Sequence, residues 1–265
     1  MRAVVINLDQ YPDRLGRMYR LAESHNIKLE RIAAVNGRDP ANFAEFEKHR
    51  AATVNDKIIS NTDMACALSH RKAWKYLLDS ADEWLAVFED DIHMGKDFSL
   101  LIDSAWIPRG VELVKLEARP NDVLLGVAPV CSIGHRRLYR LGSSYLGAAG
   151  YMISRKAAGL LLKYTEKMDV PVDSVMFGSG CALMSAIEIH QVLPAACIQE
   201  YELAKIEARE DGLPTSMIRH TGARRPFHKS LLRRVNRKVK QIASLARSKP
   251  VAVEPMQAPQ FIPFE

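Results

Sequence analysis

The chain has 265 residues, of which 48% are hydrophobic and 26% charged, with a formal net charge of +6 at pH 7. This apolar fraction supports a packed core and excludes a chain that is disordered throughout. No apolar run approaches the ~20 residues of a membrane-spanning helix, and the first run is too short for a signal peptide. The four cysteines are far apart and form no CxxC pair, so we expect reduced thiols in a cytoplasmic protein.

The first part of the chain predicts a strand, a helix and a second strand. Residues 3–8 (AVVINL) are a continuous apolar run rich in β-branched residues, which is typical of a strand covered on both faces. Apolar residues recur at helical spacing over residues 13–25, and residues 29–35 (LERIAAV) predict another strand. This unit indicates a parallel sheet with right-handed crossovers.

The middle of the chain continues the alternation of helix and strand. Residues 38–60 are polar and without a clear period, which indicates a surface excursion or short helices. Thr62 or Asp63 is expected to cap a helix that reaches about Ser80. Residues 84–88 (WLAVF) then predict a strand.

The second half predicts strands at residues 111–116, 123–127 and 145–153, with extended segments at 189–193 and 196–199. Ser154 is placed to cap a helix of about fifteen residues, and Asp173 is placed to cap another. We expect the globular domain to cover residues 1–218.

The positive charge is concentrated beyond that domain. Eleven of the 37 Lys and Arg lie at residues 219–249, which contain no Asp or Glu, and the other 26 stand against 31 acidic residues. Apolar residues recur at helical spacing among these bases, the pattern of an amphipathic helix on an anionic membrane surface. A solvated cationic helix or a segment that folds on a protein partner is the alternative. Residues 250–265 are Pro-rich and expected to be disordered or extended.

Three consecutive carboxylates, Glu89, Asp90 and Asp91, follow the strand predicted at 84–88. Ligands of open α/β sheets gather at the carboxyl ends of parallel strands. Mg²⁺ and Mn²⁺ prefer carboxylate oxygens and complete their coordination with water and substrate phosphates. The triplet therefore suits a metal that holds a diphosphate, and a solvated acidic turn is the alternative.

Polar residues also follow the first two predicted strands. Asn7 and Arg14 come after the first, and Asn36 and Gly37 come after the second. Amide and guanidinium groups at strand ends suit a base, a ribose or a phosphate, although capping or a surface position explains each of them equally well.

Ser69 and His70 lie on the helix predicted to end near Ser80. They contact the same ligand if the first turn of that helix points toward the strand ends. A buried histidine with one hydrogen bond is the alternative for His70, and helical periodicity does not separate the two interpretations.

Several stretches, in order over about residues 3–200, resemble glycosyltransferase family 25, the bacterial lipooligosaccharide type to which collagen galactosyltransferases also belong. They are VVINLDQYPDRLGRM, RIAAVNGRD, ACALSHRKAWKYLL, AVFEDDI, LVKLEAR, GAAGYMISRKAAGLLL, PVDSVMF and VLPAACIQE. The resemblance implies a GT-A-like α/β fold, a mixed and mostly parallel sheet flanked by helices, with the basic amphipathic helix beyond it. The chain departs from the family at Asp9, Gln10 and Tyr11, where basic or Ser/Thr residues are commoner.

The resemblance also implies a function. It implies transfer of a hexose, galactose or glucose, from a UDP-sugar to a glycan acceptor in lipopolysaccharide or lipooligosaccharide synthesis. The transfer is expected to invert the configuration at the anomeric carbon. Mn²⁺ or Mg²⁺ is expected at Asp91 and Glu89, and a third ligand is left open among His190, His220 and His228. The acceptor can be lipid-linked, so we expect a peripheral protein on the cytoplasmic face of the inner membrane.

Inversion needs a general base for the acceptor hydroxyl. Asp173 in PVDSVMF is the first candidate and Glu117 in LVKLEAR the second. A helix cap is the alternative role for Asp173, and an ion pair with Lys115 or Arg119 is the alternative for Glu117. A non-catalytic protein that binds a UDP-sugar or a glycan is the competing function. We expect no nucleic-acid partner, because the body of the chain outside the basic segment is acidic.

Overall fold

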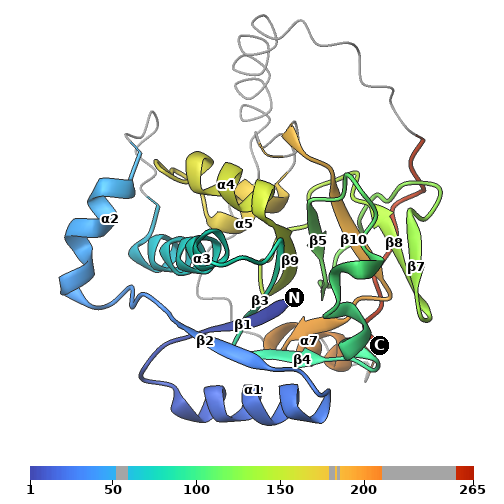
Figure 1. Cartoon of the computed structure of the whole chain (residues 1–265), viewed down its shortest axis with the longest axis horizontal. Helices are drawn as coiled ribbons and strands as arrows, with labels where there is room; N and C mark the ends of the chain where they lie inside the picture. The colour runs from blue at the N-terminus through green and yellow to red at the C-terminus, as the bar shows by residue number, and fades with distance from the viewer. Residues whose placement is uncertain (52–58, 179–182, 184–185, 211–254) are drawn as a thin grey trace, which may run out of the picture.

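The computed structural model describes residues 1–51, 59–178, 183, 186–210 and 255–265 (Figure 1). Within them, an eight-stranded sheet has the order β2-β1-β3-β9-β5-β10-β8-β7, and a three-stranded sheet has the order β4-β11-β6. The strands are β1 (Arg2–Asn7), β2 (Leu29–Ala33), β3 (Trp84–Glu89), β4 (Ile92–Met94), β5 (Leu113–Lys115), β6 (Glu117–Ala118), β7 (Cys131–Ile133), β8 (Arg136–Arg140), β9 (Gly150–Ser154), β10 (Ile189–Leu193) and β11 (Cys197–Gln199).

The helices are α1 (Pro12–Ser24), α2 (Phe43–His49), α3 (Asn61–Asp79), α4 (Arg155–Tyr164), α5 (Val172–Phe177) and α7 (Glu200–Glu210). Single 3₁₀ turns are η1 (Pro40–Asn42), η2 (Phe98–Leu101) and η3 (Ser104–Trp106). None of the described helices combines the length and the apolar character that crossing a bilayer requires.

The large sheet is mixed but mostly parallel. Strands β2, β1, β3, β5, β10 and β7 run in one direction, and β9 and β8 run in the other. This confirms the expected α/β class with a mixed, mostly parallel sheet flanked by helices. The basic helix expected at residues 219–249 lies outside the described residues.

Both faces of the sheet are covered, as the continuous apolar run at its first strand predicts. Val4 and Ile6 belong to the core shared with α3 and α4, whereas Ala3 and Val5 pack with the α1 residue Met18. Figure 1 shows α3 and α4 on one side of β1 and β3 and α1 on the other. Side chains of a strand alternate between faces, so a strand buried on both has no polar position.

The helix starts test the expected caps. Ser154 caps α4 as predicted, because its hydroxyl accepts a hydrogen bond from the Ala157 N–H at 3.1 Å, although α4 has 10 residues and not about fifteen. The caps expected at Thr62 or Asp63 and at Asp173 are wrong. Ser60 caps α3, and Pro171 holds the cap position of α5, which places Asp173 inside the first turn with no capping hydrogen bond.

The expected strands differ from the structure in two places. Residues 123–127 make only isolated bridges, and β9 begins at Gly150 and not at residue 145. Four short strands, β4, β6, β7 and β8, have no counterpart among the predictions. Within residues 38–60, the described part contains η1 and α2, in line with the short helices considered there.

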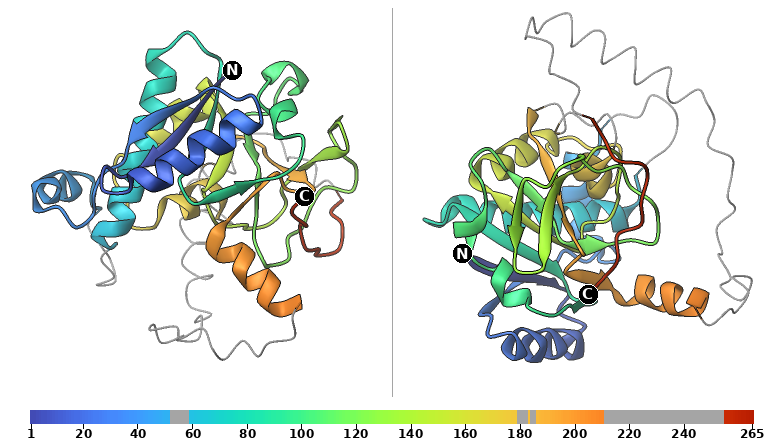
Figure 2. Two further views of the ribbon diagram at one scale, coloured as in Figure 1. Left: turned by 90° about the horizontal axis from the view of Figure 1, so that it is seen from below. Right: turned by 90° about the vertical axis from the view of Figure 1, so that its right-hand side faces the viewer.

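Residues 255–265, the C-terminal strap, return to the body of the molecule (red in Figure 2). Isolated bridges join Gln260 to Val123 and Phe264 to Ala195, and the Ile262 side chain is fully buried. The strap also meets Arg136, which is 2% exposed. The Arg136 guanidinium donates to the carbonyls of Lys96, Pro194 and Ala195, each at 2.9 Å, and to that of Glu265.

Candidate active site

The acidic triplet lies where strands from different parts of the chain end together. Glu89 is the last residue of β3, and the parallel pairing places it opposite Ile6 of β1. The turn after it leads into β4, which pairs with β11 so that Gln199 lies opposite Ile92. The pairing of β4 with β11 therefore brings Glu89 and Gln199, which are 110 positions apart, within hydrogen-bond distance.

A cavity of about 180 Å³ opens at this edge of the sheet. Its wall includes the side chains of Asp63, Cys66, Glu89, Arg119, Asp173 and Gln199. Three of these are carboxylates and one is a cation. The cavity unites the predicted residues Glu89 and Asp173, which come from β3 and α5, on a surface with an excess of negative charge.

The excess of negative charge raises the pKa of neighbouring acidic groups. Burial raises the pKa of the Cys66 thiol well above its ordinary value, and the charges of Glu89, Asp173 and Asp63 raise it further. Burial also raises the pKa of Asp91, with the charge of Glu89 as the next cause, while a hydrogen bond from Gln199 acts in the opposite direction. An added cation at this edge would relieve both effects.

Gln199 joins the acids to the one cation of the wall. Its amide nitrogen donates to Glu89 Oε2 at 3.0 Å and to Asp91 Oδ1 at 3.3 Å. Its amide oxygen accepts a hydrogen bond from Arg119 Nη1 at 3.1 Å. The amide orientation is thereby fixed, and Asp91, which is not part of the cavity wall, is held beside Glu89.

Asp90 turns to the opposite side of the turn and is 9% exposed. It accepts hydrogen bonds from Asn7 Nδ2 at 2.6 Å and from Arg14 Nη1 at 3.1 Å. Asn7 is itself held by Arg31, whose Nε donates to Asn7 Oδ1 at 3.1 Å. These hydrogen bonds fix the triplet against β1 and α1.

Three other residues predicted to contact the sugar donor, Ser69, Asn36 and Gly37, do not line the cavity. The Ser69 hydroxyl donates to the Ala65 carbonyl at 2.7 Å and accepts from the Val35 N–H at 2.8 Å. Asn36 Oδ1 accepts from the Arg38 N–H at 2.9 Å. Gly37 lies so close to α3 that an added Cβ would stand 2.9 Å from the Asn61 carbonyl oxygen.

The two candidates for the general base occupy different environments. Glu117 is 0% exposed, 2.8 Å from Lys115 Nζ and 3.2 Å from the Ala149 N–H, and it does not line the cavity. Asp173 does line it, and its Oδ2 accepts a hydrogen bond from the Gly147 N–H at 3.1 Å. The structure therefore brings Asp173 and not Glu117 to the cavity.

His70 lies behind the cavity wall and is 1% exposed. A ring nitrogen of His70, the Cys66 thiol and a Glu89 oxygen lie within 4.8 Å of one another. These three side chains are potential metal ligands. His190 is buried within β10, away from these residues in the sheet order. His220 and His228 lie outside the described residues.

Sequence reasoning missed Gln199, Arg119, Cys66 and Asp63 as members of this wall. Cys66 and His70 are four residues apart on a predicted helix, a spacing that places them on one face and could have paired them. Gln199 has no local signal, because its role arises only when β11 pairs with β4.

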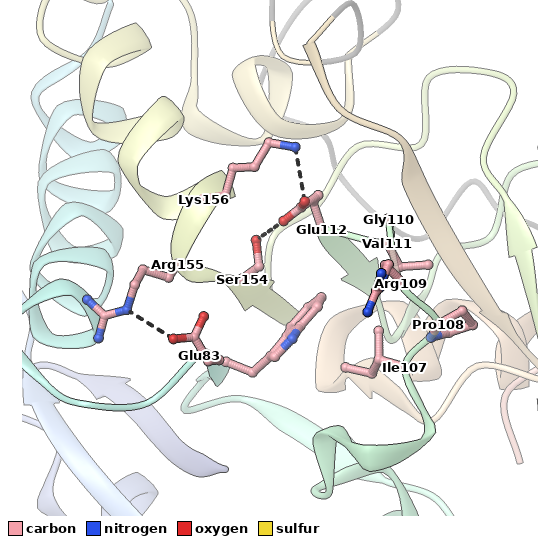
Figure 3. Close-up of a pocket in the computed structure, with 11 residues that line it drawn as sticks. Glu83, Ile107, Pro108, Arg109, Gly110, Val111, Glu112, Ser154, Arg155 and Lys156 are labelled. Carbon is pink, nitrogen blue, oxygen red and sulfur yellow. Dashed lines mark hydrogen bonds and ion pairs between the residues drawn. The ribbon is translucent and has the colours of Figure 1, made fainter.

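A larger cavity of about 300 Å³ lies at the opposite end of β3 (Figure 3). Four of its charged groups form two ion pairs: Lys156 lies 3.0 Å from Glu112, and Arg155 lies 4.0 Å from Glu83. Ser154 of its wall also donates to Glu112. This cavity is at the amino end of β3, away from the edge at which parallel sheets bind ligands.

Comparisons with known proteins give the chain its relatives. The model of glycosyltransferase family 25, described as an LPS biosynthesis protein family, matches residues 1–176. The lacto-N-neotetraose biosynthesis glycosyltransferase LgtB of Neisseria gonorrhoeae is 33% identical over 173 residues, which is 61% of each chain. LgtE of Neisseria meningitidis serogroup B is 29% identical over 184 residues, 66% of this chain and 65% of that one.

The chain thus matches about 61% of the length of the first of these curated relatives. Among solved structures, the galactosyltransferase LgtC in complex with donor and acceptor sugar analogues is 11% identical, with a TM-score of 0.38, and the match covers 94% of this chain and 98% of that one.

Proposed function

Because the chain belongs to glycosyltransferase family 25, we propose that it transfers a hexose, galactose or glucose, from a UDP-sugar to a glycan acceptor of lipopolysaccharide or lipooligosaccharide synthesis, with inversion. The observation that carries the proposal is the acidic cavity at the strand ends. Glu89 of the triplet and Asp173 both line this cavity, and Gln199 holds Asp91 beside Glu89.

Glu89 and Asp91 fit a divalent cation and would be its protein ligands. Both supply hard carboxylate oxygens, and the raised pKa of Asp91 reflects burial next to a like charge. A bound Mn²⁺ or Mg²⁺ offsets the negative charge that develops on a UDP leaving group. Gln199 orients both carboxylates, and the Asn7 and Arg14 contacts to Asp90 hold the turn that carries them.

Asp173 is the proposed general base. Its carboxylate receives the proton of the acceptor hydroxyl as that oxygen attacks the anomeric carbon. The Gly147 N–H fixes one carboxylate oxygen at 3.1 Å, which limits rotation of the side chain toward the cavity. A positioned base contributes about 10²–10⁴-fold to such a step.

UDP release from UDP-galactose, UDP-glucose and UDP-N-acetylglucosamine, each with Mn²⁺ or with a chelator, tests this function. We expect metal-dependent release from one donor, its loss in Asp91→Ala, and unchanged release in Glu83→Gln. Glu83 is a matched control because it lines the other cavity. Release that continues in Asp91→Ala would contradict the metal assignment, and UDP binding without any turnover would identify a non-catalytic sugar-nucleotide protein.

We also propose that residues 219–249, outside the described part of the chain, bind the anionic cytoplasmic face of the inner membrane, where a lipid-linked acceptor would be. The support is their eleven Lys and Arg without any Asp or Glu. Each basic residue near such a surface contributes about 1 kcal/mol. Cosedimentation with phosphatidylglycerol vesicles, lost in Arg233→Gln/Arg234→Gln/Arg237→Gln, is the expected result, and equal binding to phosphatidylcholine vesicles would contradict it.

A further inference from the structure

A chain of buried polar groups stands behind Glu89. Trp74 and Tyr151 are 0% exposed and His70 is 1% exposed. Trp74 Nε1 lies 2.9 Å from the Tyr151 hydroxyl oxygen, which lies 2.9 Å from His70 Nδ1. His70 Nε2 lies 3.4 Å from Glu89 Oε1, on the wall of the cavity. The chain crosses from α3 to β9, back to α3 and then to β3, elements that lie together in Figure 1.

The direction of these hydrogen bonds follows from the chemistry of the groups. An indole N–H only donates, so the Tyr151 oxygen accepts from Trp74. Burial raises the pKa of the Tyr151 phenol well above its ordinary value, so the hydroxyl keeps its proton and donates it to His70 Nδ1. A neutral imidazole that accepts at Nδ1 carries its own proton on Nε2. That N–H faces the Glu89 carboxylate.

Resting on the glycosyl transfer proposed above, we propose that His70 is a positioning residue: its Nε2–H, oriented by Trp74 and Tyr151, fixes Glu89 for donor and metal binding. Gln199 donates to Glu89 Oε2 at 3.0 Å, and the Cys66 thiol, 4.0 Å from Oε1, is a weaker second donor to the oxygen that His70 faces, so both carboxylate oxygens are held. A ligand whose two oxygens are held this way keeps one orientation before the substrate arrives.

The other tautomer of His70, with its proton on Nδ1, would leave Nε2 free to bind a metal ion. Cys66, His70 and Glu89 also have the residue types of a zinc site. A zinc ion on His70 would need the Nε2 lone pair and would move the imidazole proton to Nδ1. The Tyr151 oxygen would then face two donors, and its own proton would have no acceptor among the described residues. An unsatisfied buried donor is unfavourable, so we favour the positioning role.

Nitrogen-15 NMR of the metal-free protein, labelled at histidine, reads the tautomer directly. The His70 signals are assigned by their loss in His70→Gln. We expect the neutral Nε2–H pattern in the wild-type chain and a mixture of tautomers in Tyr151→Phe, which removes the donor to Nδ1. An Nδ1–H pattern, or a His70 signal that shifts with one equivalent of Zn²⁺ and not with Zn²⁺ in Cys66→Ser, would overturn the proposal.

Kinetics with the UDP-sugar separate positioning from packing. His70→Gln keeps an amide N–H near the Nε2 position, whereas His70→Asn reaches only the Nδ1 position. We expect His70→Asn to raise KM for the donor about 10–100-fold, the usual range for loss of an outer-shell partner, and His70→Gln to restore most of it. Melting temperatures of the two variants should agree within a few degrees.

Equal KM values in the two variants would contradict the positioning role while leaving the transferase function intact. A wild-type chain that releases no UDP would instead contradict the proposed function. The NMR result would still decide the tautomer in that case, so the two failures are distinguishable.

Discussion

Two acids meet at the turn that contains Gly147, and they differ in what neutralises them. Glu117 has no exposed surface and lies 2.8 Å from the ammonium of Lys115, which also donates to the Gly147 carbonyl. Asp173 accepts a hydrogen bond from the Gly147 N–H and lines the cavity. One carboxylate is committed to an internal partner and the other is available to a substrate. Both residues carry a carboxylate, and the groups that surround each carboxylate decide whether it can act on a substrate.

Replacing Asp173 gives the largest effect if this comparison holds. Asp173→Asn keeps an oxygen for the Gly147 N–H but cannot take a proton, so we expect kcat to fall about 10²–10⁴-fold. Steady-state UDP release measures the loss, and the melting temperature should stay near that of the wild-type chain. A variant that retains more than a tenth of the wild-type kcat would remove Asp173 as the base.

Replacing Glu117 should act on stability. Glu117→Leu leaves the Lys115 ammonium buried without its carboxylate, and breaking such a pair costs about 3–5 kcal/mol of unfolding free energy. Urea denaturation measures it. The double variant Lys115→Met/Glu117→Leu should recover much of the loss, because an apolar pair needs no desolvation of charge.

Glu45→Gln provides the matched control for that measurement. It removes the surface contacts of Glu45 to Lys48 and to His49. Glu45 and Lys48 are 48% and 72% exposed, and such surface pairs contribute at most about 1 kcal/mol each. If Glu117→Leu cost no more than this control, the contrast between a committed and an available carboxylate would fail.

Gly147 links the two acids, so its replacement should affect both. Its φ is +104°, and an added Cβ would stand 2.7 Å from the Glu117 carboxylate oxygens. Gly147→Ala should cost about 1–3 kcal/mol of unfolding free energy from backbone strain alone and should also lower kcat by displacing Asp173. Gly159→Ala is the control, because nothing lies within 4 Å of its added Cβ in α4 and alanine favours a helix. Loss of only one of the two properties in Gly147→Ala would show that the turn does not couple them.

The smallest effect concerns Asp91, a buried acid that lies beside Glu89. Its pKa is raised by burial and then by Glu89, so the folded state holds the Asp91 proton to a higher pH than the unfolded state does. Stability therefore falls as pH rises from the ordinary aspartate pKa, about 3.9, through the raised value. Without metal, Asp91→Asn should melt slightly above the wild-type chain at pH 7.5, and the gap should narrow toward pH 4.5. A lower melting temperature for the variant at pH 7.5 would contradict this sign.

The central strands of the large sheet were predictable because strands buried on both faces have continuous apolar sequences. β1 and β3 are apolar at nearly every position, and β10 was predicted with its observed bounds. The short strands β4 and β6 were not, because their partner β11 is distant in sequence. The hairpin of β7 and β8 is local, but arginines interrupt the apolar pattern of β8. β8 even carries Arg136, whose charge is buried only because carbonyls from three other segments surround it.

The candidate site follows the same division. The acidic triplet was predictable because it follows an apolar run directly. Asp173 was predicted as a site residue from the stretch PVDSVMF, but its predicted role as a helix cap is wrong, because Pro171 occupies the cap position. The roles of Gln199 and Arg119 depend on β11 lying beside β4, and local pattern carries no information about that pairing. Ser69 looked available on a helix face, but both of its hydrogen-bonding directions are used within the protein.

The C-terminal strap changes how the basic residues can be studied. Residues 211–254 are joined to the body at both sides, by α7 before them and by the strap after them. A C-terminal truncation would remove the buried Ile262 and one of the carbonyls around Arg136 before it removed any Lys or Arg of residues 219–249. Loss of membrane binding in such a truncated protein would report on a damaged fold. An internal excision that leaves the strap in place, or the charge substitutions given above, keeps the two causes apart.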